Sequence, residues 1–204
     1  MGLHPSKLLF SFLGGCFITS VLWGMWSAAF TMGGGAASAA GAEAERWTAD
    51  VLANLGSGGK TYHGLVFYRG RWGTGRVDVD HVAIGPYGAL VIETKFRTEP
   101  IDLNAGKLDR EVMDAVQQVE GNANRIRGLL ERDVREMPVV PVVVWWGPAI
   151  LGPVDSVRKQ GEVRLVRGVD AKHWLPLLST GRVSQDAIDR ASGKLASYAC
   201  KTDP

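Results

Sequence analysis

Two acidic residues and a lysine lie near the ends of two strand-like stretches that a short turn connects. Asp80 belongs to the stretch Arg76–Ile84, and Glu93 and Lys95 end the stretch that follows the turn. Residues two apart on a strand point to the same face, so Glu93 and Lys95 share one face of the predicted sheet. Because the turn pairs the two stretches, it can bring one carboxylate from each of them together.

These three side chains suit the hydrolysis of a phosphodiester. Acids on neighbouring strands in an apolar setting repel each other unless a positive group separates them. Mg²⁺ does so well, because it accepts one or two carboxylates and keeps water molecules that a phosphate can displace. Lys95 adds a second positive group that could hold or deprotonate a water molecule, and this combination favours in-line attack on phosphorus. The alternative interpretation is a solvated strand edge with a surface ion pair.

Further residues near these stretches could contact a nucleic acid. Arg97, two residues beyond Lys95, is the stronger phosphate-binding candidate. Arg76 is the weaker one, because it flanks a glycine-rich turn that it could equally serve by keeping it soluble. Trp145 and Trp146 could stack on an unpaired base, but their place at the end of an apolar run predicts core packing for at least one of them.

Two neighbours of Asp80 are expected to have structural roles. Asp78 lies on the same face of the strand as Asp80, and we expect it to be solvated. His81 lies on the opposite face, and we expect it to be packed or hydrogen-bonded within the fold.

The hydrophobic periodicity predicts a defined series of helices and strands. Apolar residues at three- and four-residue spacing indicate amphipathic helices, and alternating or continuous apolar runs bounded by glycine-rich turns indicate strands. In chain order the expected elements are a helix over 43–55, strands over 62–68, 76–84 and 89–94, a helix over 108–132, strands over 139–146 and 163–166, and two short helices entered through Asp170 and Ser184.

This order predicts an α/β domain with a mixed sheet flanked by helices. The first three strands form a meander, and the long helix Leu108–Arg132 carries its apolar residues on one face, which packs on the sheet. The chain then crosses over to Val139–Trp146, a continuous apolar run that is typical of a strand covered on both faces. A meander followed by such a crossover gives a mixed sheet with helices on both faces.

An apolar leader precedes this domain. Residues 8–30 contain no charged side chain, and about 20 such residues are enough for a helix to cross a bilayer. We therefore expect one N-terminal transmembrane-type helix within residues 1–32, a flexible glycine- and alanine-rich tether over 33–42, and the folded domain over 43–200. The expected location is the cell membrane, with a single pass through the bilayer and an undetermined side for the domain.

A cleaved secretory signal is the alternative interpretation of the leader. Ala37-Ser38-Ala39 has the pattern of a cleavage site, and Lys7 precedes the apolar run. Because the run is longer than the apolar part of most signal peptides, it favours the anchor.

Composition narrows the classes of function. The net charge of +2 does not suit a protein that coats long stretches of duplex, which must neutralise many phosphates, so any contact with nucleic acid is expected to be local. Cys16 and Cys200 do not make a disulfide framework. No spacing of cysteines and histidines in the sequence predicts a zinc site.

Several short motifs follow one another in the chain. Asp80-His81 is followed by the turn Gly85-Pro86-x-Gly88 and by Val91-Ile92-Glu93-Thr94-Lys95. Gly41-Ala42-Glu43-Ala44-Glu45 opens the first helix, and Gln118-Val119-x-x-Asn122-Ala123 lies on the long one. Over about residues 41–150 these motifs resemble the nuclease-related domain (NERD) family, which belongs to the PD-(D/E)xK restriction-endonuclease-like superfamily.

The resemblance implies a restriction-endonuclease-like fold and a nuclease-type site. In such a site, Asp80 and Glu93 would be ligands of Mg²⁺ or Mn²⁺, and Lys95 would orient or activate the attacking water. Glu45 would support the site from the first helix, and Gln118 would line it from the long helix.

The sequence as a whole predicts a metal-dependent, nuclease-like phosphodiesterase that acts on DNA, or alternatively RNA, and is tethered to the lipid bilayer through residues 8–30. The first alternative is a catalytically inactive module on the same scaffold, which binds nucleic acid or a protein partner. The second is a secreted nuclease released by cleavage near Ala39.

Overall fold

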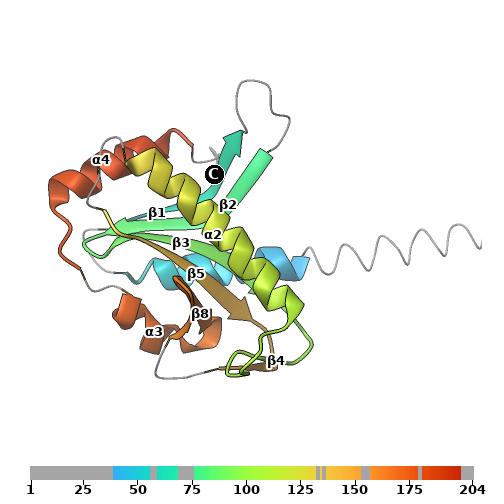
Figure 1. Ribbon diagram of the computed structural model, residues 1–204. Helices are drawn as coiled ribbons and strands as arrows, with labels where there is room; N and C mark the ends of the chain where they lie inside the picture. Colours follow the sequence, from blue (N-terminus) through green and yellow to red (C-terminus); the bar gives the residue numbers. More distant parts are fainter. Residues whose placement is uncertain are drawn as a thin grey trace, which may run out of the picture. The chain divides into compact units, whose positions relative to one another are not determined.

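A mixed β-sheet forms the centre of the part of the chain that the structure describes (Figure 1). In this computed structural model, β1, β2 and β3 form an antiparallel meander, β5 and β8 continue the sheet in parallel with β3, and β7 closes it antiparallel to β8. The strands span Lys60–Tyr68 (β1), Arg76–Gly85 (β2), Gly88–Phe96 (β3), Val139–Trp146 (β5), Arg158–Gln160 (β7) and Val163–Arg167 (β8).

The structure describes residues 39–55, 59–68, 76–131, 134, 137–152, 157–178 and 181–198. The chain divides into two compact units, Met1–Ala42 and Glu43–Pro204, and of the first only residues 39–42 are described. The expected membrane span at 8–30 and most of the expected tether therefore lie outside the described residues. Within the described ranges, no helix is both long and apolar enough to cross a membrane.

Helices cover both faces of the sheet, as the sequence predicts. On one face lie α2 (Arg110–Leu130) and α4 (Gln185–Ala196), whose apolar side chains join the core cluster of Val91 and Val143. On the other face lie the helical residues 43–52 and α3 (Ala171–Leu178), which contribute Leu52 and Trp174 to a second cluster with Leu90 and Val144. In Figure 1, α2 crosses in front of β3 and β5, with α3 and the blue helix behind them.

The turn between β2 and β3 fixes how these two strands pair. Gly85 pairs with Gly88, and the register continues to His81 opposite Ile92. Gly88 has a φ of 102°, and a Cβ there would stand 2.4 Å from the carbonyl oxygen of Pro138. Only glycine combines this conformation with so close a backbone approach. The turn therefore determines which residues of β2 and β3 lie side by side further along the hairpin.

Most of the expected elements are confirmed within a few residues. The long helix is α2, where the Asp109 carboxylate caps the N-terminus by accepting the Val112 N–H at 2.9 Å. Ser184 caps α4 as predicted, accepting the Ala187 N–H. Where a helix was expected over 43–55, residues 39–52 are helical, so residues 39–42 of the expected flexible tether belong to a helix. The expected strand over 163–166 is β8.

Two local features differ from the expectation. Asp170 was expected to open a helix, but it ends a 3-10 turn (Gly168–Asp170) that leads into α3, and its carboxylate pairs with the Arg167 Nε at 2.9 Å. A second, two-stranded sheet pairs β4 (Ile101–Asp102) in parallel with β6 (Ile150–Leu151). Strands of two or three residues, including β7, are too short to produce a periodic pattern in the sequence.

The hydroxyl of Thr48 joins the first helix to the ends of β3 and β5. It donates to the carbonyl oxygen of Ala44 at 3.0 Å, and it accepts from the Thr94 hydroxyl at 3.1 Å and from the Trp146 Nε1 at 2.8 Å. Thr48 is fully buried, and one donor with two acceptor lone pairs is the full capacity of a hydroxyl. This network holds the helix against the strand ends that carry the candidate site.

Candidate active site

Glu93 and Lys95 lie on the face of β3 that α2 covers. They continue the alternation of Ala89 and Val91, which pack in the cluster with α2. Glu93 is buried, with 2% of its surface exposed, whereas the side chain of Lys95 is 30% exposed. The Lys95 Nζ donates to the Glu93 Oε1 at 2.7 Å. The predicted sharing of one face is thus confirmed, and the two side chains form an ion pair.

Gln118 on α2 reaches the same lysine. Its Oε1 accepts a hydrogen bond from the Lys95 Nζ at 3.0 Å. Because α2 is packed along its length by buried apolar residues, the amide comes from a rigid support. The lysine is therefore held between a carboxylate of its own strand and an amide of the covering helix.

Asp80 stands on β2 beside the end of β3. Its Oδ2 accepts the backbone N–H of Thr94 at 2.7 Å, and its side chain continues the alternation of Val82 and Ile84 towards the α2 face. The pKa of Asp80 is raised to about 7, mainly by burial and then by the nearby charge of Glu93, while the Thr94 N–H and then Lys95 act in the opposite direction. The hairpin thus places two acids where both cannot easily be ionised.

Burial also raises the pKa of Glu93, against the opposing effect of the Lys95 ammonium. The Glu93 Oε1 accepts from that ammonium, but its Oε2 is buried and has no hydrogen-bond partner among the residues that the structure describes. A buried carboxylate oxygen without a donor is unfavourable unless a proton or a cation neutralises it. The side-chain arrangement therefore favours a positive group between Asp80 and Glu93 in addition to Lys95.

Mg²⁺ and Mn²⁺ fit this donor set. Within the described ranges, no group of three or more histidine, cysteine, aspartate or glutamate residues is arranged to hold a metal ion. A zinc-like cage is thus not formed there, but Mg²⁺ needs only one or two carboxylates, since water and phosphate oxygens supply its other ligands. Asp80 and the unpartnered oxygen of Glu93 match that requirement.

Glu45 approaches the site from the other side of the sheet. It is exposed on the first helix, and its charge raises the pKa of both Asp80 and Glu93. The structure thus brings Glu45 within electrostatic reach of the half-buried Asp80 and the buried Glu93. Its negative charge strengthens the demand for a cation at the site.

Of the two phosphate-binding candidates, the structure describes the side chain of Arg97 alone. The Arg97 guanidinium forms ion pairs with Glu99 at 3.5 Å, Asp109 at 3.3 Å and Glu111 at 2.8 Å. A phosphate at Arg97 would have to displace these carboxylates. Arg76 begins β2, and its side chain lies outside the described residues.

The neighbours of Asp80 have the structural roles that the sequence predicts. Asp78 is exposed. His81 is buried, and its Nδ1 lies 2.8 Å from the Nδ1 of His63. Burial lowers the pKa of His81 to about 3, with a smaller contribution from His63, so the imidazole is neutral at physiological pH.

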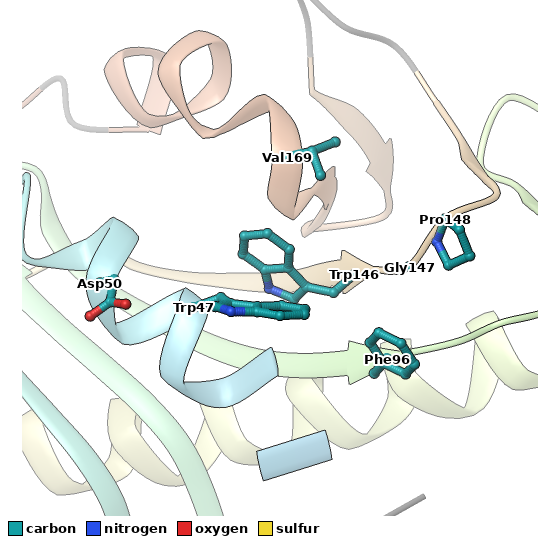
Figure 2. Close-up of a pocket in the computed structure, with 7 residues that line it drawn as sticks. All are labelled: Trp47, Asp50, Phe96, Trp146, Gly147, Pro148 and Val169. Carbon is teal, nitrogen blue, oxygen red and sulfur yellow. The ribbon is translucent and has the colours of Figure 1, made fainter. Parts of the chain in front are cut away.

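An aromatic pocket lies on the opposite face of β3 from Lys95. Trp47, Phe96 and Trp146 line it with Asp50, Gly147, Pro148 and Val169, around a volume of ≈ 540 Å³ (Figure 2). Trp145, by contrast, is a fully buried core residue, so core packing is confirmed for one of the two tryptophans. Trp47 and Phe96 were not singled out in the sequence. The sequence feature that could have pointed to them is their position: Phe96 directly follows Lys95, and Trp47 lies two residues after Glu45.

A family model described as the nuclease-related domain matches residues 40–146, which is more than half of the chain. The match begins in the first helix, includes Asp80, Glu93, Lys95 and Gln118, and ends with β5. No curated protein and no solved structure matches the chain.

The raised pKa of Asp80 predicts how the stability of the metal-free protein depends on pH. The folded state binds the Asp80 proton more tightly than the unfolded state, so this contribution to stability is fully present below about pH 4 and is lost as pH rises through about 7. Asp80→Asn keeps an acceptor for the Thr94 N–H and removes the charge. We expect the variant to be more stable than the wild type at pH 8 by on the order of 2–4 kcal/mol, and equally stable near pH 4.

Urea unfolding in EDTA at pH 4, 6 and 8 measures this difference. Parallel stability curves for the two proteins across that range would show that Asp80 has no raised pKa.

Proposed function

The chain belongs to the nuclease-related domain family, and on this premise we propose that it is a metal-dependent phosphodiesterase that cleaves DNA, with RNA as the alternative substrate. The observation that carries the proposal is the cluster of Asp80, Glu93 and Lys95, in which the lysine Nζ lies 2.7 Å from the Glu93 Oε1. The order of one helix, a three-strand meander, a crossover helix and a parallel strand is consistent with a restriction-endonuclease-like fold.

Asp80 and Glu93 would hold Mg²⁺ or Mn²⁺ in this function. When bound, the ion polarises a phosphate oxygen and lowers the pKa of a coordinated water. The Asp80 carboxylate is already oriented by the Thr94 N–H, and the Glu93 Oε2 has a buried lone pair without a donor. Both observations support an arrangement in which little has to move before a cation is accepted.

Lys95 would orient the attacking water. An ammonium has three N–H donors. Glu93 and Gln118 take two of them among the residues described, and the third can reach a water or a phosphate oxygen at the exposed end of the side chain. Gln118 is a positioning residue in this scheme, because it acts on the water only through the lysine. Glu45 supports the site by its charge.

Residues 8–30 would anchor the enzyme in the cell membrane by a single pass, with residues 33–42 as the tether. The uncharged apolar stretch supports this location. We expect the full chain to stay in the membrane fraction after an alkaline carbonate wash. A shortened protein in the medium whose N-terminus lies near Ala39 would contradict the anchor and support the secreted form.

Nuclease assays on the full 204-residue chain in detergent test the proposed activity. With Mg²⁺ or Mn²⁺, we expect cleavage of labelled single- or double-stranded DNA, and none in EDTA. Lys95→Ala should lower the rate by about 100-fold to 10,000-fold, the range that a residue handling the reacting proton or water contributes. RNA substrates of the same sequence establish which nucleic acid is preferred.

Lys60→Ala is the matched control for this assay. Lys60 is an exposed lysine at the start of β1. It pairs with Ile84, which lies at the turn end of the β2–β3 hairpin, away from Asp80 and Glu93, and its ion pair with Asp189 is exposed. Its removal should leave the rate unchanged. Equal cleavage by the wild type and Lys95→Ala would point to a contaminant. Nucleic-acid binding without cleavage in any metal would favour the inactive module.

A further inference from the structure

The aromatic pocket has a chemistry of its own. Three aromatic side chains, Trp47, Phe96 and Trp146, come from the first helix and from the ends of β3 and β5 (Figure 2). The Trp47 and Trp146 ring centroids lie 5.3 Å apart with planes at 55°, and those of Trp47 and Phe96 lie 6.4 Å apart at 54°. The rings are tilted and do not stack closely on one another. Their faces are consequently available to line the cavity.

The Trp146 ring is held in place by its surroundings. Its Nε1 donates to the buried Thr48 hydroxyl at 2.8 Å. Its six-membered ring packs so closely on Gly168 that a Cβ there would stand 2.1 Å from the Trp146 Cε2. The wall of the pocket is therefore formed before any ligand arrives, which lowers the entropy cost of binding.

The lining excludes a phosphate and suits a flat, π-rich group. Its seven residues include no lysine or arginine, so the pocket offers no positive side chain to an anion. Asp50 is its single charged residue and is exposed, where a carboxylate can accept hydrogen bonds from N–H groups at the edge of a ligand. Aromatic walls with a hydrogen-bond acceptor at the rim match an unpaired nucleobase, which has π-faces and N–H donors on its edge.

Two residues of the pocket are close in sequence to residues of the candidate active site. Phe96 follows Lys95 on β3 and pairs with Trp146 on β5, while Trp47 lies two residues beyond Glu45 on the first helix. Successive residues of a strand point to opposite faces. The end of β3 thus presents the lysine on one face and the aromatic ring on the other, so one nucleic-acid strand bent over this end can contact both.

We propose that this pocket binds an unpaired base of the strand whose phosphodiester lies at Asp80, Glu93 and Lys95. The proposal rests on the proposed function, and it names the substrate class as single-stranded nucleic acid or a duplex with a frayed or flipped nucleotide. The base is held by stacking on Trp47 and Trp146, which makes recognition tolerant of sequence because every base has a π-face.

Binding of two labelled probes to the full chain in detergent and EDTA tests the pocket without cleavage. One probe is a 15-nucleotide oligothymidylate, and the other is an abasic deoxyribose-phosphate strand of the same length. We expect the wild type to bind the thymidylate more tightly. Trp47→Ala should weaken that binding by about 5-fold to 150-fold, the range for loss of one base stack, and leave the abasic strand unaffected.

Two variants control for the fold and for the aromatic character. Trp47→Phe retains a stacking face and should bind the thymidylate within about threefold of the wild type, because stacking on Phe is also favourable. Leu177→Ala removes a large, exposed hydrophobic side chain of α3 that lies outside the pocket. This variant should bind both probes as the wild type does. Thermal unfolding shows whether each variant folds, and the comparison of the two probes on the wild type does not depend on any variant.

Equal affinity of the wild type for both probes would overturn the proposal. A loss of self-association on Trp47→Ala, with oligothymidylate binding unchanged, would assign the pocket to a second copy of the chain and overturn it as well. A tighter binding of the thymidylate than of the abasic strand, lost in Trp47→Ala, would support the base-binding pocket. It would do so even if the nuclease assay shows no cleavage, because the absence of cleavage contradicts the catalytic proposal alone.

Discussion

The side-by-side placement of a half-buried and a buried carboxylate is the constraint on which the rest of this structure depends. Asp80 and Glu93 face the same side of a hairpin, where the charge of Glu93 raises the pKa of Asp80 and burial raises the pKa of both. Lys95 neutralises part of this charge through an ion pair with one oxygen of Glu93. In the described part of the chain, the other oxygen of Glu93 has no hydrogen-bond partner. A fold does not gain stability from such a pair, which supports the proposed role of the two carboxylates in holding a cation.

The scaffold is organised to maintain this unfavourable arrangement. The glycine turn fixes the register of β2 against β3, and the Thr94 N–H fixes the Asp80 side chain. From α2, Gln118 fixes the lysine. On the opposite face, Thr48 holds the first helix to Thr94 and Trp146. Electrostatics and packing are therefore coupled through β3, whose alternate residues belong to the candidate active site and to the aromatic pocket.

The fold and the centre of the site were largely predictable because they depend on local spacing. Glu93 and Lys95 are two apart on one strand, and the turn that follows β2 brings Asp80 to them. Arg97 was less predictable, since its ion pairs with Asp109 and Glu111 come from the start of the next helix. The pocket depends on the parallel register of Phe96 with Trp146, which no local pattern reveals. Asp170 has the residue type of a helix cap, but it ends a 3-10 turn and pairs with Arg167.

In the proposed function, Asp80 and Glu93 together hold one divalent cation. Calorimetric titration of Mn²⁺ into the full chain in detergent at pH 8, where Asp80 is ionised, tests it most directly. We expect the wild type to bind Mn²⁺ at a single site, and Asp80→Asn and Glu93→Gln each to weaken the binding by at least about 10-fold. Mn²⁺ binding of the same affinity in the wild type and in both variants would contradict it.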